Sequence, residues 1–202
     1  MCGIVGYIGK SEASEILLDG LRRLEYRGYD SAGIALFGAN GVYVEKKRGR
    51  LANLEEALLS GNPPHATAGI GHTRWATHGE PSDINSHPHT SGRVTLVHNG
   101  IIENYISLRR SLEELGRQFV SQTDTETAAH LIDYYYSETK NPLTAITLAL
   151  GKIRGSYALA MIFSDIPDKI YAARCDNPLV IGVGQGENFI ASDIPAILSH
   201  TR

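Results

Sequence analysis

The 202 residues include 19 basic and 22 acidic side chains, giving a formal net charge of -3, and 42% are hydrophobic. This balance lacks the basic surplus typical of proteins that bind nucleic acid or anionic membranes. Two cysteines are too few for a disulfide-stabilised scaffold, and no stretch approaches the roughly 20 apolar residues of a membrane helix. We therefore expect one cytoplasmic domain without a signal peptide.

The chain begins Met-Cys-Gly, and Cys2 is a candidate nucleophile. Methionine removal is favoured before a small side chain, so Cys2 can become the first residue. Its α-amine, with a pKa of about 7.7–8, could then serve as the base for its own thiol. The nearby ammonium should also lower the pKa of the thiol. The alternative is that Cys2 is a small apolar residue that opens a buried strand.

Residues 3–9 form a short apolar run between glycines, which predicts a buried strand beginning at the candidate nucleophile. A helical period follows Ser11, and a polar, aromatic loop is expected over 25–33. Two strand-like runs, 32–37 and 42–47, flank a turn that favours an antiparallel hairpin. Next we expect a solvated basic cluster at Lys46, Lys47, Arg48 and Arg50, a helix over 51–61, and strands over 68–74 and 93–98.

The second half begins with a helical period over 101–115, closed by Gly116. Thr123 and Glu126 form a T-x-x-E capping box, which places Asp124 at the start of a helix running to about residue 137. The last expected elements are a helix from Pro142, strands over 156–163, 169–174, 179–183 and 188–191, and a helix starting at Pro195. Because strands and helices come in blocks, the pattern favours an α+β fold with antiparallel sheets.

Five of the eight histidines lie within one quarter of the chain, so a metal hydrolase is an alternative. They are His72, His78, His87, His89 and His98. Neither H-E-x-x-H nor C-x-x-C accompanies them, and we expect loop histidines that hydrogen-bond the backbone, with no metal and no cofactor. A phosphate-binding loop is disfavoured too, because G-x-x-x-x-G-K-[ST] is absent.

A cysteine amidase needs a nucleophile, donors for an oxyanion and a clamp for the charged end of its substrate. Asn99 and Gly100, at a predicted strand end, could offer a side-chain amide and a backbone N–H to a tetrahedral oxyanion. Arg74 could bind a carboxylate and Asp124 an amino group. These two opposite charges match the head group of an amino acid, which favours an amino acid amide as substrate.

Five stretches occur in one order along nearly the whole chain: M-C-G-I-V-G-Y-I-G (1–9), R-R-L-E-Y-R-G-Y-D-S-A-G (22–33), G-H-T-R-W-A-T-H-G (71–79), H-N-G-I-I-E-N-Y (98–105) and S-Q-T-D-T-E (121–126). The combination resembles the glutaminase domain of the glucosamine-6-phosphate synthases, which are glutamine:fructose-6-phosphate amidotransferases. More distantly, it resembles other N-terminal-nucleophile amidotransferases. The resemblance implies an N-terminal-nucleophile fold, a four-layer αββα sandwich of two antiparallel sheets between helix layers.

The resemblance also implies roles for particular residues. Cys2 would be the nucleophile, and Asn99 with Gly100 would form the oxyanion hole. Arg74 and Asp124 would bind the α-carboxylate and α-amine of glutamine, in a site that residues 74–81 close and that Trp75, Thr77, His78 and Gly100 line. Trp75 would gate ammonia transfer, and Arg27 would lie near the nucleophile. The implied reaction proceeds through a glutamyl thioester to glutamate and ammonia.

In the family, this domain continues into sugar-isomerase domains that the 202 residues do not include. We therefore expect residues 1–202 to be a C-terminally truncated glutaminase domain whose ligands are L-glutamine and L-glutamate, with the isomerase domains and a second copy as partners in the full-length homodimer. Nucleic acid and membranes are not expected partners. Two alternatives stay open: a catalytically silent glutamine-binding or regulatory domain, and the glutaminase domain of another N-terminal-nucleophile amidotransferase.

Overall fold

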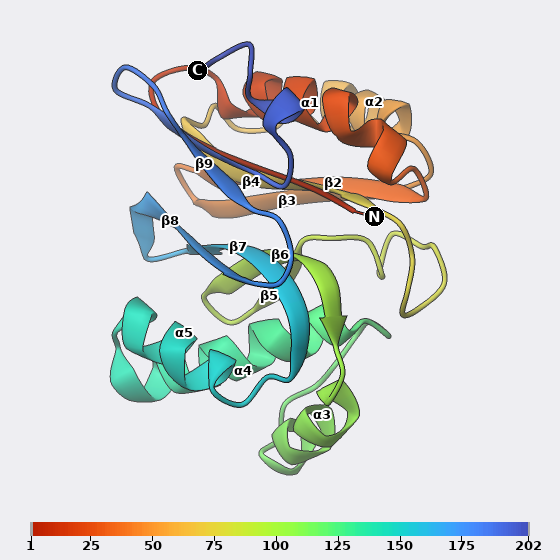
Figure 1. Cartoon of the computed structure of the whole chain (residues 1–202), viewed down its shortest axis with the longest axis vertical. Helices are drawn as coiled ribbons and strands as arrows, with labels where there is room; N and C mark the ends of the chain where they lie inside the picture. Colours follow the sequence, from red (N-terminus) through yellow and green to blue (C-terminus); the bar gives the residue numbers. More distant parts are fainter. Residues whose placement is uncertain (1, 202) are drawn as a thin grey trace.

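A computed structural model describes residues 2–201, which form two antiparallel sheets stacked face to face (Figure 1). The larger sheet contains β1 (Gly3–Ile8), β2 (Ser31–Gly38), β3 (Gly41–Arg48), β4 (Ala68–Arg74), β9 (Val180–Val183) and β10 (Asn188–Ala191). The smaller sheet contains β5 (His89–Ser91), β6 (Val94–Ile102), β7 (Gly155–Phe163) and β8 (Ile166–Cys175). No helix within residues 2–201 has the length and apolar character needed to cross a membrane.

Helices cover the outer face of each sheet (Figure 1). The larger sheet is covered by α1 (Ala13–Leu24) and α2 (Leu51–Gly61), and the smaller by α4 (Asp124–Thr139) and α5 (Pro142–Leu150), with α3 (Tyr105–Glu114) beside α4. Two short 3₁₀ helices, η1 (Glu25–Arg27) and η2 (Ile194–Ala196), complete the elements of the described chain. The predicted four-layer αββα sandwich is confirmed.

Three apolar clusters lie between the four layers and explain the composition of β1. Val5 and Tyr7 pack in the cluster under α1 and α2, whereas Ile4 packs against the other sheet in the cluster between the sheets. A central strand that is covered on both faces needs apolar side chains on both faces. The continuous apolar run at residues 3–9 is therefore a requirement of this position.

Strand order brings the beginning of β1 to the end of β4. The larger sheet has the order β3-β2-β4-β1-β10-β9, and in its register Gly3 lies opposite Thr73 while Ser31 lies opposite Arg74. Cys2, which directly precedes β1, therefore lies beside the last residue of β4. Neighbouring antiparallel strands place residues far apart in sequence at one edge of the sandwich.

The expected start of the helix over 101–115 is wrong. Strand β6 continues to Ile102, which pairs with Gly155 of β7, and α3 begins only at Tyr105. The N–H of Ile102 also donates to Asp124 at 2.8 Å. The hydrogen bonds to β7 thus outweigh the helical spacing of the apolar residues. Over so short a run, that spacing does not distinguish a helix from a strand.

Lys46 does not belong to a solvated basic cluster as expected. Its ammonium donates to the backbone carbonyls of Ile84, Ser86 and Pro88 at 3.1, 3.0 and 3.2 Å. Burial lowers the pKa of Lys46 to about 8. The side chain therefore ties β3 to the segment that leads into β5, a role visible only once the two segments lie side by side.

Candidate active site

A cavity of about 290 Å3 opens at the edge of the sandwich where β1 begins and β4 ends. All eight site residues predicted from the sequence line it, together with Arg27. The full lining consists of Cys2, Arg27, Arg74, Trp75, Thr77, His78, His87, His98, Asn99, Gly100, Ile101, Thr123, Asp124, Thr125, Ser156, Asn177 and Pro178. Both sheets contribute, so the cavity exists only when the two sheets are stacked.

The Cys2 thiol lies against the backbone of Trp75. Its Sγ accepts a hydrogen bond from the Trp75 N–H at 3.2 Å and lies 3.5 Å from the Trp75 carbonyl oxygen. Burial raises the pKa of the Cys2 thiol, and the hydrogen bond from Trp75 lowers it by less. Attack by a thiolate here therefore requires a base, and the lowering expected from a free α-amine on Cys2 stays a prediction for the chain without Met1. Met1, whose removal the prediction invokes, lies outside the described residues.

Arg74 ends β4 and is 2% exposed. Its Nη2 donates to the carbonyl oxygens of His78 and Gly79, the latter at 2.8 Å. Its Nη1 lies 3.9 Å from Asp30 and has no hydrogen-bond partner among residues 2–201. A guanidinium stays charged and has five N–H donors, so this buried cation can still bind an anionic group in the cavity.

Asp124 is the first residue of α4 and is 4% exposed. The predicted cap is confirmed, since the Thr123 hydroxyl accepts from the Glu126 N–H at 3.2 Å. Asp124 Oδ2 accepts from the Ile102 N–H at 2.8 Å. The helix start therefore aims a carboxylate at the cavity from the side of the smaller sheet, while Arg74 comes from the larger sheet.

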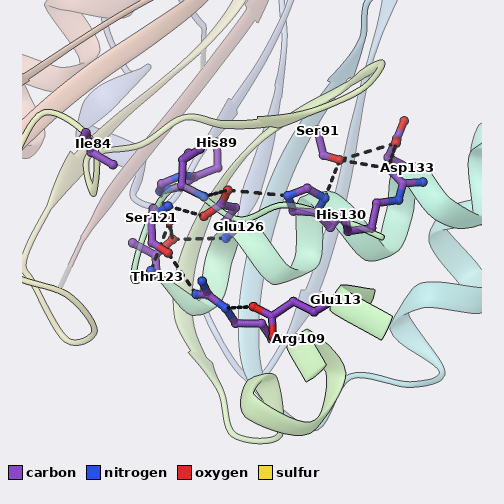
Figure 2. Close-up of polar contacts among 12 residues, drawn as sticks. Ile84, His89, Ser91, Arg109, Glu113, Ser121, Thr123, Glu126, His130 and Asp133 are labelled. Atoms are coloured by element: carbon purple, nitrogen blue, oxygen red, sulfur yellow. Dashed lines mark hydrogen bonds and ion pairs between the residues drawn. The ribbon is translucent and has the colours of Figure 1, made fainter. Parts of the chain in front are cut away.

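The other half of the capping box differs from its usual form, because Glu126 bonds to the preceding loop (Figure 2). Its two carboxylate oxygens accept from the N–H groups of Val120 and Ser121 at 2.9 and 2.6 Å, and His130 lies 3.6 Å away. Burial raises the pKa of Glu126, but the hydrogen bonds from His130, Ser121 and Val120 outweigh it and hold the pKa at about 2. Glu126 thus anchors the loop that leads into Asp124.

The substitution Glu126→Gln is expected to lower the free energy of unfolding at pH 7 by about 2–3 kcal/mol, because a charged acceptor for two N–H groups is lost. The depressed pKa means that this contribution is fully present above about pH 4.5 and is lost as the pH falls toward about 2. Urea unfolding of the two proteins at pH 7 and pH 5.5 tests both points, because the difference between them should be the same at these two pH values. Equal stability of the two proteins at pH 7 would contradict the anchoring role, and Glu138→Gln on the same helix is the matched surface control.

Asn99 and Gly100 lie side by side on β6, facing the cavity. Asn99 Nδ2 donates to the Cys2 carbonyl oxygen at 2.9 Å, so its amide N–H points toward the nucleophile residue. Gly100 has a φ of 123°, where side chains are strongly disfavoured. A Cβ there would also collide with the Ser156 carbonyl oxygen and the Asn177 side chain.

Gly100→Ala is accordingly expected to reduce turnover by about 100-fold or more and to lower the free energy of unfolding by about 2 kcal/mol or more. The added methyl group must push the Gly100 peptide away from Ser156, which displaces any donor at this position. Ammonia release and urea unfolding of the same preparation measure the two effects. Gly116→Ala is the control, because Gly116 also has a positive φ, 85°, but a Cβ there has no heavy atom within 4 Å. Wild-type turnover in Gly100→Ala would show that the position is unimportant.

Trp75, Thr77 and His78 belong to the loop after β4. Trp75 is 49% exposed, and its ring lies edge-on to Tyr29 at a centroid distance of 5.4 Å. His78 makes a similar contact with Tyr105 at 5.1 Å, and Thr77 is exposed. The N–H of Ala76 donates to Asp30. These contacts hold the loop at the mouth of the cavity through aromatic edges and backbone bonds.

Arg27 is 7% exposed and lines the same cavity. Its Nη1 forms an ion pair with Asp193 at 2.9 Å and donates to the Ser192 carbonyl oxygen at 3.4 Å. Tyr26 donates to the same carboxylate at 2.7 Å. Arg27 and Cys2 both line the cavity, which agrees with the expected position of Arg27 near Cys2. The contacts of Arg27 and Tyr26 connect η1 with the segment after β10.

Four of the five clustered histidines are buried, and the rings of three of them pack against one another. The rings of His72 and His87 stack at 4.1 Å, and His87 meets His89 edge-on at 4.9 Å. Within residues 2–201 no group of three or more His, Cys, Asp or Glu side chains is arranged to hold a metal ion. The expectation of loop histidines is wrong for His89, which lies on β5, whereas His72 and His98 lie on β4 and β6, where strands are expected.

Sequence reasoning missed several residues of the cavity. His87, Thr125, Ser156 and Asn177 line it, and Asn177 follows β8, far from every motif. Thr125 bonds to two of the histidines, accepting or donating at 2.7 Å to His87 and 3.0 Å to His98. No local sequence pattern marks Asn177. The motif stretches 71–79 and 121–126, by contrast, include the sequence neighbours of Arg74 and Asp124, and these neighbours could have been identified from the motifs.

The profile described as "Glutamine amidotransferase domain" matches residues 72–199, more than half of the chain. The chain belongs to this glutamine amidotransferase family. Among curated relatives, the "Glutamine--fructose-6-phosphate aminotransferase [isomerizing]" of Clostridium tetani is 57% identical over 204 residues, which cover 100% of this chain and 33% of the relative. The enzyme of the same name from Pyrococcus horikoshii is 51% identical over 208 residues, covering 100% of this chain and 34% of the relative.

Solved structures show that the glutamine amidotransferase fold extends over the whole domain. The glutamine phosphoribosylpyrophosphate amidotransferase of B. subtilis, solved with ADP and GMP, matches with a TM-score of 0.84 and 29% identity, covering 99% of this chain and 44% of that chain. A glutamine aminotransferase class-II domain protein from Silicibacter pomeroyi shares the fold, with a TM-score of 0.64, 14% identity and coverage of 94% of this chain and 88% of that chain. The N-terminal-nucleophile amidotransferase fold expected from the motifs is confirmed.

Proposed function

We propose that this glutamine amidotransferase domain hydrolyses L-glutamine to L-glutamate and ammonia through a thioester on Cys2. The observation that carries the proposal is the meeting, in one cavity, of a thiol, a side-chain amide next to it, and buried charges of opposite sign. The two charges come from Arg74 and Asp124, on different sheets. A single amino acid with a terminal carboxamide would match the thiol, the side-chain amide and both charges at once.

The reaction begins with removal of Met1, which exposes the α-amine of Cys2. Since burial raises the pKa of the thiol, the amine takes the thiol proton as the sulfur attacks the carboxamide carbon. The C=O electrons move onto oxygen, which the Asn99 amide and the Gly100 N–H stabilise. The C–N bond breaks as the leaving nitrogen takes the proton, and ammonia departs from the glutamyl thioester.

Water then completes the cycle. The Cys2 amine accepts a proton from a water molecule, whose oxygen attacks the thioester carbonyl carbon, and the same two donors stabilise the second oxyanion. The C–S bond breaks, the thiol regains its proton, and L-glutamate leaves. Residues 74–81 would cover the substrate during these steps, with Trp75, Thr77 and His78 at the mouth of the cavity.

The chain spans about a third of the length of the curated relatives it matches. Because those relatives are named as isomerizing aminotransferases of fructose 6-phosphate, we extend the proposal to ammonia delivery toward a sugar-phosphate site outside the 202 residues. Trp75 would gate that transfer, and a homodimer in the cytoplasm is the proposed setting of the full-length protein. The 57% identity to these relatives favours this acceptor over that of another amidotransferase.

Ammonia release from L-glutamine, measured with a coupled assay, tests the proposal against a silent glutamine-binding domain. We expect steady turnover by the chain lacking Met1, slower turnover of L-asparagine, and a Cys2-linked adduct about 129 Da heavier by mass spectrometry after acid quenching, which is the mass of glutamine less that of the released ammonia. Binding of glutamine without ammonia release would identify a silent domain. Loss of turnover on adding a chelator would revive the metal alternative, and we expect none.

Arg74→Ala is expected to raise KM for L-glutamine by about 100-fold or more, because a buried charge-assisted contact to the α-carboxylate is lost. The kcat at saturation should change less. Steady-state kinetics over a wide glutamine range separates the two effects, and the urea midpoint reports folding. Arg110→Ala, a surface change on α3, is the control. An unchanged KM would remove Arg74 from substrate binding.

A further inference from the structure

The side-chain amide of Asn99 is held at both ends by groups whose hydrogen-bonding roles are known. His72 Nε2 lies 3.0 Å from the His98 carbonyl oxygen and 3.0 Å from Asn99 Oδ1. A carbonyl oxygen only accepts, so His72 has its proton on Nε2 and must meet an acceptor, Oδ1, on Asn99. The other end of the amide faces the Cys2 carbonyl oxygen at 2.9 Å, which requires Nδ2. One orientation of the amide satisfies every partner.

The imidazole of His72 is well suited to hold that orientation. His72 is fully buried, and burial lowers its pKa to about 3, so the ring is neutral near pH 7 with one N–H. Its ring stacks on His87, and its Nδ1 has no hydrogen-bond partner in the part of the chain that the structure describes. Rotation of the ring would bury an unsatisfied N–H or lose the bonds to His98 and Asn99. His72 therefore offers a fixed donor.

A second side chain holds the backbone beside this amide. Asn177 Nδ2 donates to the Asn99 carbonyl oxygen at 3.0 Å. The peptide that joins Asn99 to Gly100 is planar, so a bond that fixes its C=O also fixes its N–H, which belongs to Gly100. Asn177 thus sets the direction of the main-chain donor, while His72 sets the direction of the side-chain donor.

We propose that His72 and Asn177 are the positioning residues of the oxyanion hole, His72 acting through the Asn99 amide and Asn177 through the Gly100 N–H. The inference rests on the proposed function, which places the oxyanion at these two donors. Neither residue needs to touch the reacting carbonyl group. A preorganised donor loses its effect when it can turn away, so the two residues should affect kcat far more than KM.

A double-mutant cycle tests the His72 arm. His72→Phe, which keeps a ring for stacking but removes the donor, is expected to lower kcat for L-glutamine by about 10- to 100-fold with KM within about threefold. His72→Gln, which retains an N–H donor, should recover part of this loss. In an Asn99→Ala background, His72→Phe should cost less than about twofold, because its target is gone. A kcat of His72→Phe within twofold of wild type, or equal losses in both backgrounds, would overturn the proposal.

Asn177→Ala is expected to differ from His72→Phe in the double-mutant cycle, because its effect should not depend on the Asn99 side chain. Asn177→Ala should lower kcat by about tenfold in both backgrounds, since the Gly100 donor remains when the Asn99 amide is removed. His130→Phe is the matched control, because His130 is also buried and bonds to Ser91 at 3.0 Å but lies outside the cavity lining. It should change the unfolding midpoint and leave kcat within about twofold. No effect of Asn177→Ala in either background would overturn this arm.

A readout that does not depend on turnover separates this inference from the proposed function. The side-chain amide of Asn99 gives a pair of 15N–1H signals, assigned by their loss in Asn99→Ala. His72→Phe should shift both signals, and His130→Phe should not. Unchanged Asn99 signals in His72→Phe would refute the positioning role. If the wild-type protein released no ammonia but His72→Phe still shifted the Asn99 signals, the proposed reaction would be refuted, whereas the contact between His72 and Asn99 would stand.

Discussion

Cys2→Ala is expected to reduce ammonia release from L-glutamine by about 10⁴-fold or more, because the covalent route disappears with the sulfur. Alanine is as acceptable as cysteine for methionine removal, so the two proteins start with the same free amine. The variant should still bind L-glutamate, since Arg74 and Asp124 lie on other elements. Coupled ammonia assays and calorimetric titration with L-glutamate measure the two properties.

Two outcomes of this experiment are decisive. Equal ammonia release by wild type and Cys2→Ala would end the nucleophile assignment. Loss of L-glutamate binding together with activity would indicate that the alanine protein is misfolded, and Cys2→Ser then provides the test, because serine preserves the size and a hydrogen-bond donor beside the Trp75 backbone. Cys175→Ala, at the end of β8 and outside the cavity lining, is the control for general thiol loss.

Retention of Met1 should also suppress turnover, by about 100-fold or more, even though Cys2 is intact. A peptide nitrogen has no basic lone pair, so the proton of a thiol whose pKa is raised by burial has no acceptor on the same residue. Preparations with and without Met1 are distinguished by intact mass and compared in the same assay. Equal rates would mean that another group in the cavity serves as the base.

Acid is expected to unfold this protein well above the pH at which carboxylates titrate. Burial lowers the pKa of His72 and of His89 to about 3, and it also lowers the pKa values of His87 and His98. An unfolded chain binds these protons near pH 6.5, so the unfolded state holds more protons between about pH 3 and 6.5. Stability therefore rises with pH through this window and is lost as the pH falls below about 6.5.

The slope of this dependence is the measurable quantity. Each buried histidine should contribute about 1.4 kcal/mol per pH unit to the free energy of unfolding within the window. Urea unfolding followed by circular dichroism between pH 7.5 and pH 5 gives the slope. His89→Gln should reduce the slope by the contribution of about one histidine. His65→Gln, with a side chain 77% exposed, should leave it unchanged. A flat stability from pH 7 to pH 5 would contradict the prediction.

Much of the local structure follows from residues that are neighbours in the sequence. The hairpin of β2 and β3 is confirmed, because Asn40 and Gly41 suit a tight turn whatever surrounds them. The Thr123 cap and the helix ending at Gly61 are confirmed for the same reason. The motifs also identified eight of the residues that line the cavity, since the stretches that carry them end strands or begin a helix at one edge of the sandwich.

Long-range packing decided the features that the sequence alone predicted wrongly or missed. Ile101 and Ile102 belong to β6 because β7 lies beside them, and Lys46 is half-buried because the segment before β5 crosses it. The pKa of Cys2 rises because the cavity walls exclude water, which outweighs nearby donors. Asn177 reaches Asn99 across a separation of 78 residues. Chain-local patterns encode dihedral preferences, whereas desolvation and cross-strand contacts depend on which surfaces meet, and that is settled only by the folded sandwich.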